Sequence, residues 1–339
     1  MSITSETKKH PLPLLKRWLM AVNGCNVPQI ELVDGVTKWL IISRACVFSM
    51  TLTSGIIGVL LAAIYSEINW WYSLLSVIGL IIAHASNNLI NDYIDVKRGV
   101  DTEDYPRTQY SVHPILGGLT TPGGFLKAVF LLNLLDGIIM IYFVSVRGPI
   151  ILGFALAGLF LSLAYTGLLK RFGLGELTAL IVWGPLMIGG TAFVASGKLS
   201  IEILLNTLPY GLIVASVLVG KHIDKIEADK LVGVRSIPVL LGEKRALVLN
   251  KALFVLFYVT IAGLVVFRIT GWEILLTIIA VPRLKMAWEA YSKPKPATPP
   301  EGWTVWPLWY VGWAMFFNRQ AGEFFVMGLM LNLALGYFF

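Results

Sequence analysis

Long apolar segments recur along almost the whole of this 339-residue chain, and they constrain its fold more than any other feature. Hydrophobic residues make up 56% of the chain and charged residues only 14%, whereas a soluble domain has about 25% charged residues. The mean hydropathy is +0.74. A run of about 20 apolar residues is long enough to cross a bilayer as a helix. We therefore predict an all-α polytopic membrane bundle, formed as a single domain over residues 1–339.

About nine transmembrane helices can be placed from the hydropathy pattern. A polar lead-in, 1–37, precedes them on the cytoplasmic or interfacial side, and a loop rich in Pro and Trp, 291–320, precedes the last one. A tenth span over 303–317 is the alternative topology, and it would move the C-terminus to the other side of the membrane. The predicted spans are 40–65, 70–91, 125–146, 150–169, 176–196, 203–221, 247–267, 272–290 and 321–338.

Basic residues are distributed unevenly between the two predicted sides of the membrane. The connections after the first, third, fifth and seventh spans hold only Arg147, Lys198 and Arg268, and Arg44 lies inside the first span. The remaining Lys and Arg lie on or near the N-terminal side. By the positive-inside rule the N-terminus is cytoplasmic and the C-terminus is outside. The net charge of +7 therefore reflects topology, and we expect no nucleic-acid partner.

The N-terminal part of the chain carries both cysteines, Cys25 and Cys46. Their spacing matches no metal-binding or redox motif, so we expect no disulfide framework. The same region lacks the pattern of a cleavable signal peptide.

Acidic and amide side chains gather at the end of the second predicted span. If that helix continues, Asn91 and Asp95 are four residues apart and share one face, as do Asn88 and Asp92. A chain reversal after the helix then lets Asp101 fold back towards them. A charge near lipid is costly unless it is paired, solvated or bound to a metal, and Mg²⁺ prefers oxygen ligands. The alternative is a solvated helix end, with Asp95 paired to a neighbouring basic residue.

A second acidic segment follows the sixth predicted span and contains Asp224, Glu227 and Asp229. The predicted topology places it on the same, cytoplasmic side as the first segment. Lysines are interspersed among the acids, as suits a site for metal ions and a diphosphate together. The alternative is an amphipathic loop with a pair between Lys225 and Asp229.

Two further polar residues lie inside predicted spans. Asp136 is a functional candidate because an intramembrane carboxylate is rare, but we favour a protonated or Asn-paired structural group. His84 lies one to two turns before the asparagines of the first acidic segment. We favour the interpretation that His84 is packed inside the helical bundle. The alternative is that it acts as a base facing a bound substrate.

These motifs together make the chain similar to a known family. It resembles the UbiA superfamily of intramembrane prenyltransferases, and within it the 1,4-dihydroxy-2-naphthoate prenyltransferases of menaquinone synthesis. The similarity runs over about 39–242. The second aspartate motif departs from the usual Asp-x-x-x-Asp, because Lys225 stands four residues before Asp229 and Asp224 is one residue early, so either Asp224 or Glu227 is the partner of Asp229. The matching segments are 91–102, 113–122, 165–176, 183–185 and 229–238.

The resemblance implies a reaction and a set of site residues. The reaction is transfer of an isoprenyl group from an isoprenyl diphosphate to an aromatic quinone precursor. It takes place among the lipids of a bacterial inner membrane, and it requires Mg²⁺, bound as two ions. The implied metal ligands are Asn91, Asp92, Asp95, Asp101, Asp224, Glu227 and Asp229. Of these, Asn91, Asp95, Asp101 and Asp229 are the implied catalytic residues. The implied substrate contacts are Asn88, Arg107, Tyr165, Lys170, Glu176 and Arg235.

Two other functions are compatible with the sequence. A terpene cyclase of the same fold ionises the same donor but uses an internal alkene as the nucleophile. An ion-coupled transporter also carries acidic residues, but usually near the middle of the membrane and within internal repeats. The acids of this chain lie at helix ends on one predicted side, which favours an enzyme.

Overall fold

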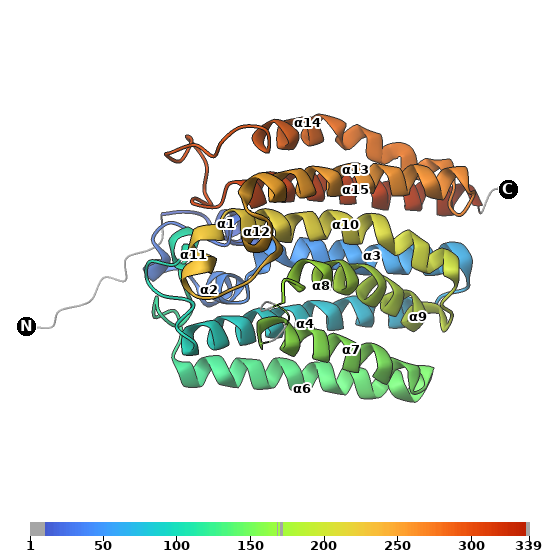
Figure 1. The fold of residues 1–339 in the computed structure, drawn as a ribbon. Coiled ribbons are helices and arrows are strands. Elements are labelled where there is room, and N and C mark those ends of the chain that lie inside the picture. Colours follow the sequence, from blue (N-terminus) through green and yellow to red (C-terminus); the bar gives the residue numbers. More distant parts are fainter. Residues whose placement is uncertain (1–10, 168, 170–171, 337–339) are drawn as a thin grey trace, which may run out of the picture.

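The computed structural model describes residues 11–167, 169 and 172–336, and within them it is helical, with no strand. The long helices lie side by side in one bundle (Figure 1). In chain order the elements are α1 (Leu14–Gly24), η1 (Ile30–Leu32), α2 (Gly35–Ile42), η2 (Ala45–Val47), α3 (Phe48–Tyr65), α4 (Trp70–Lys97), α5 (Pro106–Tyr110), α6 (Pro122–Arg147), α7 (Ile150–Gly167), α8 (Gly175–Ile181), η4 (Val182–Gly189), α9 (Gly190–Ser196), α10 (Ile201–Ile223), α11 (Ile226–Leu231), α12 (Ile237–Leu241), α13 (Glu243–Val266), η5 (Trp272–Ala280), α14 (Val281–Ala290) and α15 (Tyr310–Gly336).

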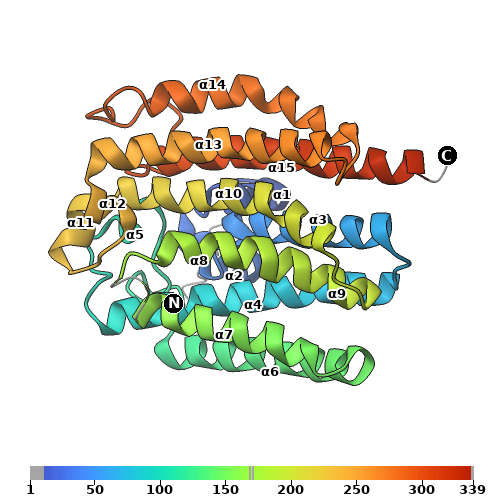
Figure 2. The same cartoon turned by 45° about the vertical axis from the view of Figure 1, so that its right-hand side comes forward.

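Short helices gather at one end of the bundle, which we call the capped end. Helices α1, α2, α11 and α12 lie there, at the left of Figure 1. The first acidic segment lies at the end of α4 and in the loop after it, the second follows α10, and both belong to this end. Across the bundle, α6 and α7 form one side and α14 the opposite side, as both ribbon views show (Figure 2).

Six helical segments of the described chain are long and apolar enough to cross a membrane. They are Ala45–Tyr65, Trp70–Lys97, Pro122–Arg147, Gly175–Ser196, Ile201–Ile223 and Glu243–Val266. They coincide with six of the predicted spans. The α10 segment is 72% buried and forms the centre of the bundle, whereas the α6 segment is only 6% buried. Apolar side chains such as Phe130 and Ile141 are therefore exposed on α6, as expected for a lipid-facing helix.

The helix that begins with α8 changes its winding in the middle of the bundle. Segment η4 is π-helical and contains Pro185, and Gly184 has non-helical backbone angles. Gly211 of α10 packs against this segment so closely that a Cβ there would lie 2.9 Å from the Leu180 carbonyl oxygen. The irregular winding leaves backbone groups of this segment without helical hydrogen bonds, and α3 supplies a partner. Ser54 donates a hydrogen bond to the Trp183 carbonyl oxygen (2.8 Å). This irregularity shapes one wall of the central cavity described below.

The C-terminal helix starts earlier than the sequence pattern predicted. Helix α15 runs without a break from Tyr310, so the predicted loop over 291–320 ends at residue 309. No separate helix forms over 303–317, because its second half is the first part of α15. The early start has a tertiary cause: the Asp224 carboxylate accepts hydrogen bonds from the backbone N–H groups of Tyr310 (3.0 Å) and Val311 (2.9 Å).

The expectation of no disulfide was wrong. Cys25 and Cys46 form a disulfide, with Cα atoms 5.2 Å apart. They are 21 positions apart, which matches no motif, and only the packing of α1 against η2 brings them together. The bond fastens the lead-in to the chain two residues after Arg44, a residue of the candidate site.

Candidate active site at the capped end

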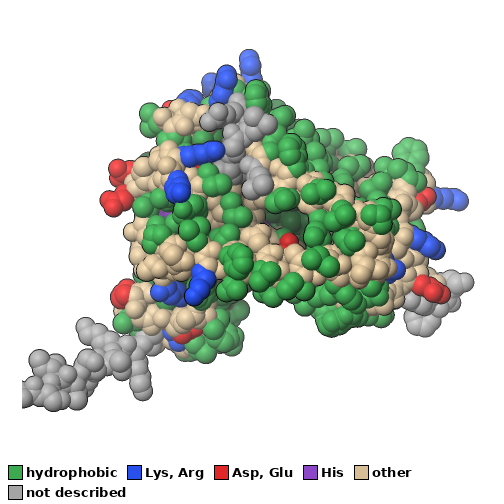
Figure 3. Space-filling model, turned by 90° about the horizontal axis from the view of Figure 1, so that it is seen from below, with side chains coloured by type: hydrophobic (Ala, Val, Ile, Leu, Met, Phe, Trp, Pro, Cys, Tyr) green, Lys and Arg blue, Asp and Glu red, His purple; other side chains and the backbone are tan. Residues whose placement is uncertain are grey.

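A cavity of about 1180 Å³ runs into the bundle from the capped end. Near that end its wall includes the polar side chains of Asn88, Asn91 and Lys221. Further along α6 and α7 the wall becomes apolar, with residues such as Phe143 and Phe154. The outer surface on the α6 and α7 side is also mainly apolar and is hollowed near its middle (Figure 3). The cavity therefore joins a polar head region to a long apolar chamber.

Helix α4 carries the first acidic segment, and its Asn88 and Asn91 line this head region. It continues past the predicted span to Lys97, which meets the condition for Asn91 and Asp95 to share one face, and Gly99 then adopts a positive φ of 69°, which reverses the chain. The N–H of Asp101 donates a hydrogen bond to the Asp95 carbonyl oxygen (3.2 Å), so Asp101 does fold back onto the helix end. Asn88 donates from its amide to the Ser43 carbonyl oxygen (3.0 Å).

Asp92 is buried between two arginines. Arg107 donates to Asp92 Oδ2 (3.1 Å), and Arg44 donates to both carboxylate oxygens. Asp92 and Arg107 are both less than 5% exposed, so each of these charges requires the other. The structure thus gives Asp92 a pairing role and commits Arg107, a predicted substrate contact, to the same ion-pair network.

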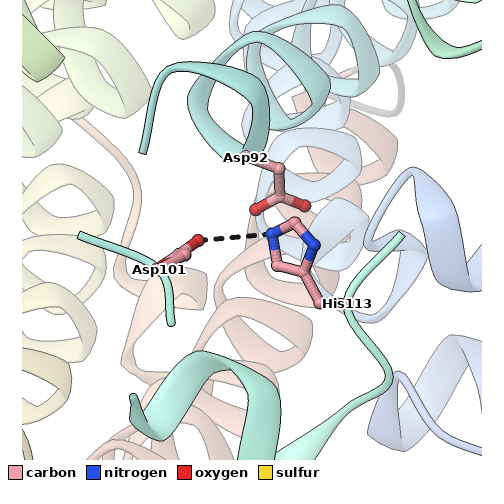
Figure 4. Close-up of side chains that lie close together, drawn as sticks. All are labelled: Asp92, Asp101 and His113. Atoms are coloured by element: carbon pink, nitrogen blue, oxygen red, sulfur yellow. Dashed lines mark ion pairs between the residues drawn. The ribbon is translucent and has the colours of Figure 1, made fainter. Parts of the chain in front are cut away.

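Asp101 and His113 face each other beside this network (Figure 4). His113 Nε2 lies 3.4 Å from Asp101 Oδ2. The other ring nitrogen, Nδ1, accepts hydrogen bonds from the N–H groups of Ile115 and Leu116, so a neutral ring carries its proton on Nε2. Ligand atoms of Asp92, Asp101 and His113 all lie within 4.8 Å of one another.

The charges around Asp101 favour its ionised form. Burial raises the pKa of Asp101, but His113 and the positive charges of Arg44, Lys225 and Arg107 together outweigh it and lower the pKa. Burial also lowers the pKa of His113, which keeps the ring neutral. Asp101 is thus an anion within a positively charged surrounding, as a metal or diphosphate site requires.

The second acidic segment meets the first through Asp229. The Tyr105 hydroxyl donates a hydrogen bond to Asp229 Oδ1 (2.6 Å), and Lys225 Nζ lies 3.5 Å from the same oxygen. The Lys225–Asp229 pair that the sequence allowed is therefore present, but it uses only one carboxylate oxygen. Asp229 lies within α11 rather than just beyond a helix, because the chain breaks between α10 and α11 and starts a new turn.

Three buried polar atoms at the capped end make no hydrogen bond within the described part of the chain, although two of them, Asp101 Oδ2 and His113 Nε2, face each other at 3.4 Å. They are Asp101 Oδ2, His113 Nε2 and Asp229 Oδ2. A buried carboxylate oxygen without a hydrogen bond is costly, and the two carboxylates come from the two different acidic segments. Such oxygens are what a hard divalent cation binds.

The other two acids of the second segment point elsewhere. Asp224 is buried and caps α15, and burial raises its pKa to about 6. The Glu227 side chain is 84% exposed and pairs with Lys230 at 2.8 Å. Within the described chain, neither carboxylate joins the orphaned oxygens of Asp101 and Asp229.

The remaining predicted substrate contacts have different surroundings. Glu176 is buried at the start of α8, 2.5 Å from His222 Nδ1, and accepts a hydrogen bond from the Ile237 N–H (3.3 Å). It therefore joins α8, α10 and α12. Arg235 is exposed on the loop before α12. Lys170 and the side chain of Tyr165 lie outside the described part of the structure.

The two intramembrane residues singled out from the sequence both line the cavity. His84 is packed between the rings of Phe48 and Trp183 and shares a hydrogen bond with Thr51 Oγ1 (2.7 Å). This is the packed histidine that the sequence favoured. Asp136 lines the apolar chamber, opposite Gly79 of α4.

Three residues of the site were not assigned roles from the sequence: Arg44, Tyr105 and His113. Arg44 carried a signal, since an arginine inside an apolar span requires an acidic partner. Tyr105 carried none, because its partner Asp229 lies 124 residues away.

The family model of the UbiA prenyltransferases matches residues 51–318, which include both acidic segments and the cavity-lining helices. The chain belongs to the UbiA prenyltransferase family. It is accordingly a prenyltransferase, as its curated relatives are. The 1,4-dihydroxy-2-naphthoate octaprenyltransferase of Bacillus subtilis (strain 168) is 27% identical over 324 residues, which cover 93% of this chain and 97% of that protein.

Further relatives agree with this assignment. The 2-carboxy-1,4-naphthoquinone phytyltransferase of Synechocystis sp. is 31% identical over 218 residues, covering 62% of this chain and 66% of that protein. Among solved structures, the apo UbiA homologue from Aeropyrum pernix K1 has a TM-score of 0.63 at 19% identity, covering 84% of this chain and 97% of that one. A UbiA homologue from Archaeoglobus fulgidus bound to GPP and Mg²⁺ has a TM-score of 0.58 at 14% identity, covering 85% and 99%. These structural likenesses show a common fold.

Proposed function

We propose that this prenyltransferase transfers an isoprenyl group from an isoprenyl diphosphate to an aromatic quinone precursor of the 1,4-dihydroxy-2-naphthoate type. The observation that carries the proposal is the pair of buried carboxylates, Asp101 and Asp229, whose Oδ2 atoms make no hydrogen bond within the described chain, together with an apolar cavity lined by Arg44, whose charge acts on Asp101. A charged head and an apolar tail need these two environments in one continuous site. The naphthoate relatives supply the acceptor class.

The residues fit Mg²⁺, and we propose that Asp95, Asp101 and Asp229 hold it with Asn91, as two ions. The basis for the fit is the orphaned carboxylate oxygens and the absence of thiolate or multiple imidazole ligands near them within the described chain. When bound, Mg²⁺ neutralises the charge of a diphosphate leaving group. Asp92 then has a positioning role, because Arg44 and Arg107 already neutralise it.

The protein's own groups orient and assist the transfer. The bond between C1 of the donor and the diphosphate oxygen breaks, and the electron pair leaves with the diphosphate. A ring carbon of the acceptor bonds to C1, and the ring then loses a proton or its carboxyl group. Lys221 lines the polar part of the cavity and Lys225 lies beside Asp229, so both add positive charge near the departing diphosphate.

The isoprenyl tail lies in the apolar chamber between α4, α6 and α7. Its burial contributes about 0.8 kcal/mol per methylene equivalent. Chamber residues such as Met140 and Phe143 offer no hydrogen-bonding group that a hydrocarbon would leave unpaired.

We further propose nine membrane-spanning segments, with α7, the continuous η5–α14 segment and α15 in addition to the six apolar ones. The 27-residue α15 and the 18-residue α7 have enough length for this. The capped end faces the cytoplasm, with the N-terminus, in the inner membrane of a bacterium. The uneven distribution of Lys and Arg supports this orientation.

The test is an assay of purified protein with radiolabelled geranylgeranyl diphosphate and Mg²⁺, with and without 1,4-dihydroxy-2-naphthoate. We expect a prenylated aromatic product that requires both the acceptor and the metal, and none in excess chelator. A cyclic hydrocarbon formed without acceptor identifies a terpene cyclase instead. If the prenyl diphosphate is neither consumed nor bound, both the prenyltransferase and the terpene cyclase are ruled out, and ion-coupled transport becomes the first alternative.

A further inference from the structure

The central cavity has a second arm, on the opposite side from α6 and α7. Residues of α14, α15 and the loop that precedes α15 line it. We call it the aromatic chamber and define it by Trp303, Trp313, Phe316, Arg283 and Arg319, all of which line the cavity. None of these residues belongs to either acidic segment, and Arg319 lies just beyond the part of the chain that matches the family.

One face of α15 forms the floor of this chamber. Trp313, Phe316 and Arg319 are each three residues apart and therefore follow one another along the same side of the helix. The Trp303 ring lies across this face, with its centroid 5.5 Å from that of Trp313. Gly312 makes this possible, since a Cβ there would lie 2.4 Å from the Trp303 ring.

Two arginines line the chamber together with the aromatic rings. The Arg283 guanidinium carbon lies 4.1 Å from the centroid of Phe316, and Arg319 follows Phe316 by one turn. Arg319 is nine residues into α15, which corresponds to about 13 Å of helix. Within the described chain, neither arginine forms an ion pair with a carboxylate. The carboxylate that acts most on Arg319 is that of Glu323, one turn further along α15, and it is exposed and forms no close ion pair with Arg319. A positive charge at such depth is costly without a close anion, so the chamber suits an anionic group.

Two donors in the chamber lack a partner. Arg319 Nε and the indole N–H of Trp313 are buried and make no hydrogen bond within the described residues. Other nitrogens of Arg319 do bond, to the Cys46 carbonyl oxygen (3.0 Å) and to Asn23. The guanidinium is thus fixed in place with one donor unused.

The chamber adjoins the acidic site through η2. Arg319 is bonded to Cys46, and Arg44, two residues earlier, pairs with Asp92. Asn91, Tyr110 and Trp313 line the same cavity. A flat molecule in the chamber therefore lies beside the place where the donor's diphosphate would be held.

We propose that the aromatic chamber is the acceptor site and that it selects a planar aromatic acid. The acceptor rings stack against Trp303 and Trp313, and the carboxylate pairs with Arg283 and Arg319. This inference rests on the proposed prenyl transfer. A lipid phosphate has the same charge, but a headgroup would not need the aromatic wall that Trp303, Trp313 and Phe316 form.

The test compares Arg283→Gln with the wild type and with Arg245→Gln, an exposed arginine of α13 outside the cavity. The probes are 1,4-dihydroxy-2-naphthoate and its analogue without the carboxylate, 1,4-dihydroxynaphthalene. Removing a hydrogen bond to a charged group costs about tenfold to a hundredfold in affinity. We expect Arg283→Gln to raise the KM of the acid by that factor. The KM of the analogue and that of geranylgeranyl diphosphate should stay unchanged, and Arg245→Gln should change nothing.

A binding measurement without turnover separates this inference from the function itself. Naphthoate should quench tryptophan fluorescence in the absence of donor, and Trp303→Phe should weaken the quenching. If the wild type transfers prenyl groups but Arg283→Gln and Trp303→Phe leave the acid's KM and the quenching unchanged, the chamber is not the acceptor site. If Arg283→Gln raises the KM of geranylgeranyl diphosphate, the chamber is part of the diphosphate site and the inference is overturned. If phosphatidylglycerol vesicles change the tryptophan fluorescence and naphthoate does not, the chamber is a lipid site. If the wild type transfers nothing, the proposed function has failed, whereas quenching still reports on the chamber.

Discussion

The Tyr105 hydroxyl lies 2.6 Å from Asp229 Oδ1 and joins the two acidic segments of the chain. Tyr105 belongs to the loop after α4, and Asp229 belongs to α11. Asp229 raises the pKa of this tyrosine further, on top of a larger effect of burial, so the hydroxyl remains a donor. The bond leaves Asp229 Oδ2 as the oxygen without a partner.

Tyr105→Phe should therefore loosen Asp229 without removing a charge. We expect kcat to fall about tenfold, the cost of roughly one hydrogen bond to a charged group, while the protein remains folded. The measurement is the steady-state rate with size-exclusion behaviour in detergent as the folding check. Tyr258→Phe is the matched control, because that hydroxyl donates to Thr277 on the far side of the bundle. Equal losses in both variants would indicate a general effect of losing a hydroxyl.

Asp101→Asn and Asp229→Asn should each abolish turnover, because each removes the charge from an orphaned carboxylate. The exposed Glu227 provides the contrast, and Glu227→Gln should retain nearly full activity. Titration of activity with Mg²⁺ is the measurement, and the two Asn variants should not be rescued by excess metal. Loss of activity in Glu227→Gln would return the second ligand role to that residue.

The ion-pair network of Asp92 should be important for folding. Asp92→Asn leaves two arginines facing each other without their anion, and we expect a loss of roughly 3 kcal/mol in unfolding free energy. Thermal unfolding in detergent should show this as a lower midpoint than in Arg107→Gln, where Arg44 still pairs with Asp92. The exposed Glu289–Lys293 pair is the control, and Glu289→Gln should shift the midpoint little.

Asp34 gives the lead-in a pH-dependent stability. Burial raises the pKa of Asp34, but hydrogen bonds from Thr37 and Trp18 outweigh it and lower the pKa to about 2 from 3.8. A lowered folded-state pKa stabilises the fold above the unfolded value, and this contribution disappears as the pH falls from 3.8 towards 2. Asp34→Ala should therefore cost about 1–2 kcal/mol at neutral pH, as expected for a helix N-cap. The difference in unfolding midpoint between wild type and variant should shrink below pH 4, and a constant difference would contradict the assignment.

The orientation of the capped end can be tested by labelling. Leu231 on α11 is 88% exposed beside the second acidic segment. In a Cys25→Ser, Cys46→Ser background, Leu231→Cys should react with an impermeant maleimide in inverted membrane vesicles and not in intact spheroplasts. Arg268→Cys, in the turn after α13 at the other end of the bundle, should show the reverse pattern. Labelling of Leu231→Cys from outside would place the site on the wrong face for the proposed topology.

The hydrophobic pattern determined much of the architecture without help from tertiary structure. Runs of apolar residues defined the helices because lipid leaves backbone groups no other partner. The four-residue spacing of Asn91 and Asp95 and the positive φ of Gly99 follow from local geometry, so the helix end and the return of Asp101 were predictable. The family resemblance in the same segment was confirmed by the match over residues 51–318.

Only tertiary structure decided which carboxylates are paired and which are left without partners. Asp92, Asp101 and Asp224 look alike in sequence, yet Asp92 lies between two arginines, Asp101 faces His113, and Asp224 caps a helix that begins 86 residues later. Each of these partners is distant along the chain, so no local spacing records it. The same holds for the Cys25–Cys46 bond and for the side-by-side placement of Trp303 and Trp313. Sequence determines where a charge enters the apolar bundle, whereas packing determines what neutralises it, because Coulomb and hydrogen-bond energies depend on distances that exist only in the folded chain.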